Sequence, residues 1–217
     1  KKSGNLDVAV IYTKTQAVVA GTFTQNKVAA APVYVSKEVV ATGTAHAIVA
    51  NAGCANACTG QQGLDDAHKM AQIAADELGV NANDVIVGST GVIGVNLPMD
   101  KLEAGIKDAV ANLSADGSDN AGRAIITTDT HSKSVTCEFE LSGKTVRMGA
   151  IAKGSGMIRP NMATMLCYIT TDIAIDQALL QKAVSGCVEK SFNMISVDGD
   201  MSTNDMVIVL ANGEANN

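Results

Sequence analysis

A short glycine-rich stretch that leads to a threonine carries the residue types best suited to chemistry. Residues 154–156 read Gly-Ser-Gly, Pro160 stiffens the approach, and Thr164 follows Ala163 and begins a strand-like run. A threonine hydroxyl alone is a poor nucleophile. If the chain is cut just before Thr164, the freed α-amine, whose pKa is about 7.7–8.0, can act as the base for that hydroxyl. Threonine at the start of a strand is also common in proteins without this chemistry, so the segment alone leaves both interpretations open.

Histidine and cysteine, which often serve as nucleophiles or metal ligands, form no recognisable motif. Cys54, Cys58 and His68 lack an obvious fourth zinc ligand and the spacing of a paired C-x2-C unit. The thiols are therefore interpreted as small apolar groups, and no metal is expected. His46 and His131 do not adjoin a serine or cysteine in a nucleophile motif. A Ser–His–Asp arrangement that forms only in space stays open.

Glycine-rich turns and one acidic cluster are the remaining candidates. The stretches 88–91 and 154–156 lack both the dinucleotide-binding pattern G-x-G-x-x-G and the phosphate-binding P-loop pattern, which favours tight turns. Asp198, Asp200 and Asp205 could hold a cation, but aspartates more often form turns and local hydrogen bonds. We therefore expect a structural role for these three residues.

The composition indicates a globular chain and excludes several classes of function. Of 217 residues, 47% are hydrophobic and 18% are charged, which suits one large domain or two small ones with a packed core. A net charge of −6 without a Lys/Arg cluster argues against nucleic-acid binding. No apolar run is long enough for a membrane span, and residues 1–4 precede a strand-like segment instead of a signal-peptide core. Five cysteines, an odd number, favour a reducing, cytoplasmic setting.

Apolar residues at helical spacing predict three helices that help to position these motifs. The first covers 65–78, with acidic residues at its start and Gly79 just past its end, and the second follows Pro98. The third is capped by Asp176. The residues expected to face inward are Met70, Ile73, Ala74, Leu78, Leu102, Ile106, Val110, Leu113, Leu180, Ala183, Val184, Cys187 and Val188.

Runs rich in β-branched residues predict many short strands, so the pattern is mixed α/β and unlike a regular βαβ array. Strands are predicted over 6–11, 17–23, 45–50, 85–87, 124–128, 135–141, 145–151, 165–171, 195–198 and 206–211. The first two are expected to form a hairpin around a polar turn at 13–16. A second hairpin joins 135–141 to 145–151 around 142–143, and residues 114–122 are expected to form a loop.

The 153–166 segment and several other stretches of the chain occur together, in the same order, in one known family. The other stretches are 21–24 with 30–33, 56–60, 89–94, 127–130 and 198–205. On these motifs the chain resembles, over essentially its whole length, the ornithine acetyltransferase family. Members are also called bifunctional glutamate N-acetyltransferases and N-acetylglutamate synthases of arginine biosynthesis. Within the resemblance, 21–24 with 30–33 correspond to the early hairpin region of the family.

The resemblance implies a self-cleaving enzyme. The precursor would cut itself between Ala163 and Thr164, giving an α piece of residues 1–163 and a β piece of which 164–217 is the start. Thr164 would take the acetyl group from N2-acetylornithine and pass it to glutamate through an acetyl-enzyme. The resemblance implies no bound cofactor, but acetyl-CoA is a co-substrate of some members. The pieces would assemble as an α2β2 heterotetramer in the cytoplasm, without a nucleic-acid or membrane partner.

The resemblance also implies roles for four further residues. Thr90 and Gly91 match the oxyanion hole, where a hydroxyl and a backbone N–H stabilise the negative charge of the tetrahedral state. Thr127 and Lys153 match substrate-binding residues, and a cation at Lys153 suits the carboxylate of an amino acid.

The fold implied by the resemblance is α/β, a layered α-β-β-α sandwich similar to self-cleaving aminopeptidases of the N-terminal-nucleophile type. The sequence departs from the family at Cys54, where asparagine is usual. Family members also continue past 212–214, with a glutamate and a C-terminal Asn and Thr that complete the substrate site. Two other functions stay open: a self-cleaving aminopeptidase or amidase of the same fold, and a non-enzymatic binding domain.

Overall fold

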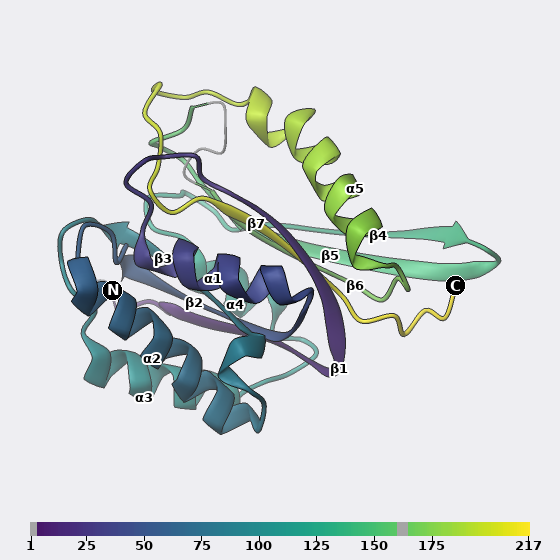
Figure 1. The fold of residues 1–217 in the computed structure, drawn as a ribbon, viewed down its shortest axis with the longest axis horizontal. Helices are drawn as coiled ribbons and strands as arrows, with labels where there is room; N and C mark the ends of the chain where they lie inside the picture. The colour runs from purple at the N-terminus through teal and green to yellow at the C-terminus, as the bar shows by residue number, and fades with distance from the viewer. Residues whose placement is uncertain (1–3, 160–164) are drawn as a thin grey trace.

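A computed structural model describes residues 4–159 and 165–217, and within them the strands form one mixed seven-stranded sheet (Figure 1). The strand order is β3-β2-β1-β7-β6-β5-β4. The strands are β1 (Val8–Phe23), β2 (Thr44–Cys54), β3 (Val85–Val92), β4 (Lys133–Leu141), β5 (Lys144–Lys153), β6 (Leu166–Thr171) and β7 (Met206–Ala211). The α-helices are α1 (Ala31–Thr42), α2 (Gly60–Leu78), α3 (Met99–Ala111), α4 (Ser118–Ile125) and α5 (Gln177–Glu189).

The pairing of the strands brings three chain segments to one edge of the sheet. β2 and β3 are parallel, as are β6 and β7, and the other neighbouring pairs are antiparallel. β6 and β7 begin at the same level, because Leu166 pairs with Met206. Antiparallel β5 ends there too, because its last residue Lys153 pairs with Leu166. The end of β5 therefore lies beside the starts of β6 and β7.

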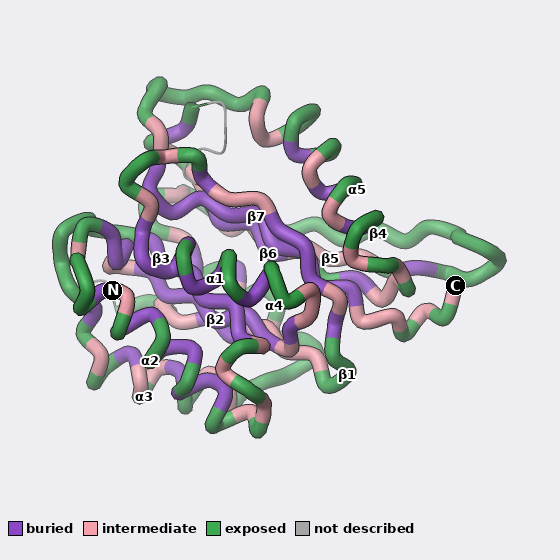
Figure 2. Tube along the Cα trace, viewed as in Figure 1, coloured by how far each residue is buried: buried purple, intermediate pink, exposed green. Residues whose placement is uncertain are grey.

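Helices cover the sheet with their apolar faces and produce three clusters of buried side chains. α2 and α3 pack on each other, α2 also packs against β2 and β3, and α3 packs against β1. α5 packs on β1, β6 and β7. A central cluster joins α1 and α4 to the strands around the buried Tyr168. Buried segments occupy the middle of the molecule, whereas the tip of the β4–β5 hairpin is exposed (Figure 2). Within the described ranges, no helix is both long and apolar enough to cross a membrane.

Several predicted elements are confirmed. The helix expected over 65–78 lies within α2, which begins five residues earlier at Gly60, and Gly79 adopts the left-handed conformation that ends it. Asp176 caps α5, because its side chain accepts a hydrogen bond from the backbone N–H of Leu179. The hairpin around 142–143 is β4 and β5.

For two helices, some of the residues predicted to face inward are exposed instead. Leu180 and its helical neighbours at four-residue spacing are buried in α5, but Ala183 and Cys187 are exposed. Leu113 lies beyond the end of α3 and is also exposed. A helix on one face of a sheet buries only a stripe of its surface, so apolar residues beside that stripe stay in water.

The first predicted hairpin is wrong. Residues 8–23 form the single strand β1, and both of its halves pair with β2, with a register shift between Tyr12 and Ala17. The polar residues 13–16 suggest a turn in the sequence, but in the structure they stay within the strand, and three of them are exposed where it bulges. A bulge accommodates polar side chains without reversing the chain. The second half of β1 then pairs with β7 as well.

The loop at 114–122 and the strand at 124–128 are also wrong, because residues 118–125 form the short helix α4. Its apolar side is buried against β1 and β5, and the apolar run 124–126 resembles a strand only in isolation. Residues 195–198 form no strand, because Ile195 and Val197 are exposed and no strand pairs with them. The region 30–33, expected to belong to a hairpin, begins α1, with proline in its first turn.

Candidate active site

Three residues predicted from separate motifs meet at the end of β5. Lys153 donates hydrogen bonds from Nζ to the Thr90 Oγ1 at 3.0 Å and to the Thr127 Oγ1 at 3.1 Å. Thr90 lies on β3, and Thr127 lies in the segment after α4. Lys153 and Thr90 are buried, at 3% and 5% exposure, whereas Thr127 is exposed. The tertiary structure therefore brings a buried ammonium group and two hydroxyl groups together.

Gly91 follows Thr90 on β3 and could not be another residue without local movement. Its φ is +133°, a conformation that side chains rarely adopt. A Cβ at this position would contact the carbonyl group of Gly53, its partner on β2. The absence of a side chain lets the two parallel strands approach closely beside Thr90.

These residues line a cavity of about 600 Å³. Its wall consists of Gly53, Ala55, Thr90, Gly91, Val92, Ile93, Thr127, Thr128, Lys153, Gly156, Met157, Ser202, Thr203 and Asn204. The predicted cleavage residues Ala163 and Thr164 lie outside the described residues. The described chain approaches that segment through Met157 at the cavity wall and continues after it at Met165, next to the start of β6.

The hydrogen-bond pattern leaves the Thr90 hydroxyl able to donate. A threonine hydroxyl has one hydrogen to donate and can accept two hydrogen bonds. The Thr90 oxygen accepts from Lys153, so its own hydrogen must point elsewhere, and the side chain lines the cavity. The site can therefore offer a neutral O–H donor and a nearby cation to an oxygen that gains negative charge.

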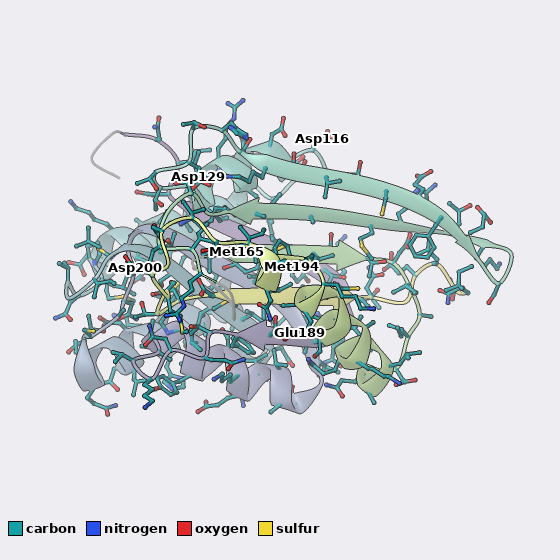
Figure 3. All side chains as sticks on the ribbon, turned by 90° about the horizontal axis from the view of Figure 1, so that it is seen from above. Asp116, Asp129, Met165, Glu189, Met194 and Asp200 are labelled. Carbon is teal, nitrogen blue, oxygen red and sulfur yellow. The ribbon has the colours of Figure 1, made fainter. Side chains whose placement is uncertain are left out.

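Asp129 holds the segments that carry these residues, a role that the sequence did not reveal. Its side chain has no exposed surface, and its Oδ1 accepts from the Gly154 N–H at 2.8 Å and from the Lys133 Nζ at 2.6 Å. Burial opposes ionisation, but these two donors and the charge of Lys153 together lower the pKa of Asp129. The carboxylate thus ties the residue after Lys153 to the Thr127 segment. Figure 3 shows Asp129 and Met165 away from the tip of the β4–β5 hairpin.

Two of the three aspartates of 198–205, Asp198 and Asp205, make structural hydrogen bonds through their side chains, as predicted, and both do so beside the cavity. Asp198 accepts from the backbone N–H groups of Met157 at 2.5 Å and Ile158 at 2.8 Å, which lower its pKa. Asp205 accepts from the N–H of Met165 at 2.7 Å. The part of the chain that the structure describes contains no cluster of three potential metal-ligating side chains.

A larger hollow of about 840 Å³ lies between the start of β1, the α3–α4 region and strands β4 to β6. It contains none of Thr90, Gly91, Thr127 and Lys153. Cys54, which departs from the resembled family, ends β2 and is absent from the wall of the smaller cavity. The smaller cavity is the candidate site because a cation, hydroxyl groups and a glycine that leaves no room for a side chain converge there.

Comparisons of sequence agree with these motifs. The model of the ArgJ family matches residues 1–217. The "Arginine biosynthesis bifunctional protein ArgJ" of Symbiobacterium thermophilum is 53% identical over 215 residues, which are 99% of this chain and 54% of that protein. The protein of the same name from Caldanaerobacter subterraneus is 51% identical over 216 residues, 100% of this chain and 54% of the relative. The chain therefore spans about half the length of the curated relatives it matches.

Comparisons of structure agree with the fold. An ornithine acetyltransferase from Mycobacterium tuberculosis, solved with ornithine, is 35% identical with a TM-score of 0.65, covering 76% of this chain and 87% of that chain. An ArgJ protein from Bacillus halodurans is 36% identical with a TM-score of 0.62, covering 75% and 96%. An aminopeptidase from Ochrobactrum anthropi of the Ntn-hydrolase fold is 12% identical with a TM-score of 0.52, covering 95% and 61%, which shows the fold alone. The predicted fold class is confirmed.

Proposed function

Because the chain belongs to the ArgJ family, we propose that its protein transfers the acetyl group of N2-acetylornithine to glutamate in arginine biosynthesis. One observation carries the proposal: Lys153, Thr90 and Thr127, taken from three separate motifs, meet at one cavity beside the start of β6. The relative of known structure that was solved with ornithine supports a substrate of this class.

In the proposed reaction, Thr164 is the nucleophile. Its hydroxyl oxygen attacks the acetyl carbonyl carbon of N2-acetylornithine while the α-amine of Thr164 takes the hydroxyl proton. The tetrahedral intermediate expels the α-amine of ornithine, which receives that proton, and leaves an acetyl ester on Thr164. The amine of glutamate then attacks the ester, and the departing threonine oxygen recovers a proton. Atoms and charge balance over the two halves, and no cofactor is needed.

The cavity residues would stabilise this reaction. The Thr90 O–H and the Gly91 N–H would donate to the acetyl oxygen as it becomes negative, and each such donor is typically worth about 3–4 kcal/mol in the transition state. The buried Lys153 cation and the Thr127 hydroxyl would hold a substrate carboxylate. Lys153 also orders both hydroxyl groups, since it donates to each.

The proposal includes self-cleavage between Ala163 and Thr164, which exposes the α-amine that the mechanism requires. The rest of the proposal is an α2β2 heterotetramer in the cytoplasm, without nucleic acid or membrane, and acetyl-CoA as a second acetyl donor. The amidase alternative is not favoured, because the aminopeptidase likeness shows only a shared fold.

Intact mass spectrometry of the full-length protein tests the proposal. The expected result is two polypeptides, with the one that begins at Thr164 gaining the mass of one acetyl group after incubation with N2-acetylornithine and losing it after addition of glutamate. Thr164→Ala should give one uncut chain without an adduct. An adduct on another residue, or normal transfer by Thr164→Ala, would refute the nucleophile. Acetyl-CoA in place of N2-acetylornithine tests the second donor.

A further inference from the structure

Both backbone polar groups of Met165 are held by two consecutive residues. The N–H of Met165 donates to the Oδ1 of Asp205 at 2.7 Å, and its carbonyl oxygen accepts from the N–H of Met206 at 3.0 Å. Met165 lies just before β6, where Figure 3 labels it, and Asp205 lies just before β7. Ordinary pairing of β6 with β7 explains the second hydrogen bond. The first one uses a side chain.

Asp205 is an unusual residue to find at this place. It is fully buried, and its Oδ2 has no hydrogen-bond partner among the described residues. A buried carboxyl oxygen without a partner is unfavourable, since it has lost its water. Burial raises the pKa of Asp205 to about 7, although the Met165 N–H, the nearby Ser202 hydroxyl and the charge of Lys153 lower it in part. A polar group kept at such cost is a candidate for a functional role.

The surroundings connect Asp205 to the candidate active site. On the other side of β6, Leu166 pairs with Lys153, the last residue of β5, whereas Asp205 directly precedes β7. The ammonium group and the carboxyl therefore come from the segments on either side of the start of β6. The backbone of Asp205 is itself anchored, because its carbonyl oxygen accepts from the Thr24 N–H at 2.9 Å. The carboxyl therefore projects from a fixed backbone position.

We propose that Asp205 is a positioning residue for the nucleophile, acting through the N–H of Met165. The peptide group is planar, so holding this N–H also fixes the plane that includes the Cα of the preceding residue. That residue is Thr164. In this proposal, the contact acts on Thr164 through the peptide bond that joins Thr164 to Met165, and its loss affects both self-cleavage and acetyl transfer. The proposal rests on the proposed function of Thr164.

Two conservative variants distinguish the effect of the position of the Asp205 side chain from the effect of its acidity. Asp205→Asn keeps an acceptor oxygen at the same distance from the backbone but has no acidic proton. Asp205→Glu keeps the acid but displaces it by one methylene group. Misplacing a reacting group by about 1 Å can lower a rate about 100-fold. Asp205→Glu should therefore lower kcat at least about tenfold with KM for N2-acetylornithine within about threefold, and should slow self-cleavage similarly. Asp205→Asn should stay within about threefold of the parent in all three quantities.

Asp66→Glu is the matched control, since Asp66 is also a buried aspartate but lies on α2, outside the cavity wall. It should leave kcat and the cleavage rate near those of the parent. Equal kcat for Asp205→Glu and the parent would overturn the proposal. So would a larger loss of kcat in Asp205→Asn than in Asp205→Glu, because acidity and not position would then matter.

A measurement that needs no activity keeps the proposal separate from the proposed function. In full-length protein labelled with 15N-methionine, the Met165 amide resonance, assigned by its loss in Met165→Leu, should move upfield in Asp205→Glu and stay close to its parent position in Asp205→Asn. If the amide behaves so but no acetyl adduct forms on Thr164, the proposed function fails and the contact stands. An unmoved Met165 resonance in Asp205→Glu overturns the contact itself.

Discussion

The buried carboxyl of Asp205 should make the stability of the protein fall as the pH rises, and Asp205→Asn should remove this effect. Burial raises the pKa of Asp205 from the ordinary 3.8 to about 7, against the Met165 N–H and the charge of Lys153. Between these two pH values the folded protein keeps a proton that the unfolded chain has released. The free energy of unfolding therefore decreases with rising pH through that window, and the loss is complete above it.

The size of this change in stability follows from the difference between the pKa values of Asp205 in the folded and the unfolded protein. About three pH units separate the two pKa values, and each is worth about 1.4 kcal/mol, so ionising Asp205 in the folded protein costs about 4 kcal/mol. Asparagine has nearly the same size and does not titrate. The free energy of unfolding of Asp205→Asn, relative to the parent, should therefore increase by about 4 kcal/mol between about pH 4 and pH 8.

Urea unfolding at a series of pH values measures this difference. Both proteins should carry Thr164→Ala, which is expected to keep the chain uncut, and should be compared at equal protein concentration. Lys153→Met provides a second arm: without the cation, the pKa of Asp205 should rise further, and the loss of stability should extend to higher pH. A difference between Asp205→Asn and the parent that stays constant over the whole range would refute the reasoning.

Three further predictions concern the other residues of the site. Gly91→Ala should destabilise the protein by at least about 2 kcal/mol in thermal unfolding and lower kcat about 100-fold. Gly94→Ala, where a Cβ meets open space, should cost about 1 kcal/mol and leave kcat unchanged; equal effects of the two variants would contradict the close approach of β2 and β3. Lys153→Met should raise KM for N2-acetylornithine at least about tenfold, whereas the same change at the exposed Lys107 should not. If steady-state kinetics show an unchanged KM for Lys153→Met, Lys153 does not bind the substrate carboxylate. Asp129→Ala should lower the free energy of unfolding by about 2 kcal/mol and Asp129→Asn by less, and wild-type stability in both would show that the buried carboxylate is dispensable.

The sequence was most informative where one strong local pattern acted alone. The amphipathic spacing of α2 with Gly79 after it, and the cap at Asp176, depend on residues a few positions apart, and the structure confirms both. The errors at 13–16 and 114–128 arose where distant partners decided the outcome. β1 continues through its polar residues because β2 pairs on both sides of them, and α4 is helical because its apolar side has a sheet to cover.

The residues of the candidate site also fall into those that the sequence identified and those that it did not. Motif resemblance selected Thr90, Gly91, Thr127 and Lys153 without any knowledge of distance, and the structure shows that they share one cavity wall. Resemblance assigned no role to Asp129 or Asp205, and nothing local distinguishes them from the exposed Asp200. An aspartate becomes a buried hydrogen-bond acceptor only when other parts of the chain surround it, so its burial could not be read from its neighbours in sequence.

By itself, the sequence determined the class of fold, the family and the residue types available for chemistry, because these depend on composition, local periodicity and ordered motifs. The tertiary structure alone decided which of those residues meet. Residue 90 reaches residue 153, and residue 165 reaches residue 205, only because β3, β5, β6 and β7 end or begin near one cavity. Hydrogen bonds and charges act over a few ångströms of space, whatever the separation along the chain, and it is the packing of the sheet that sets those distances.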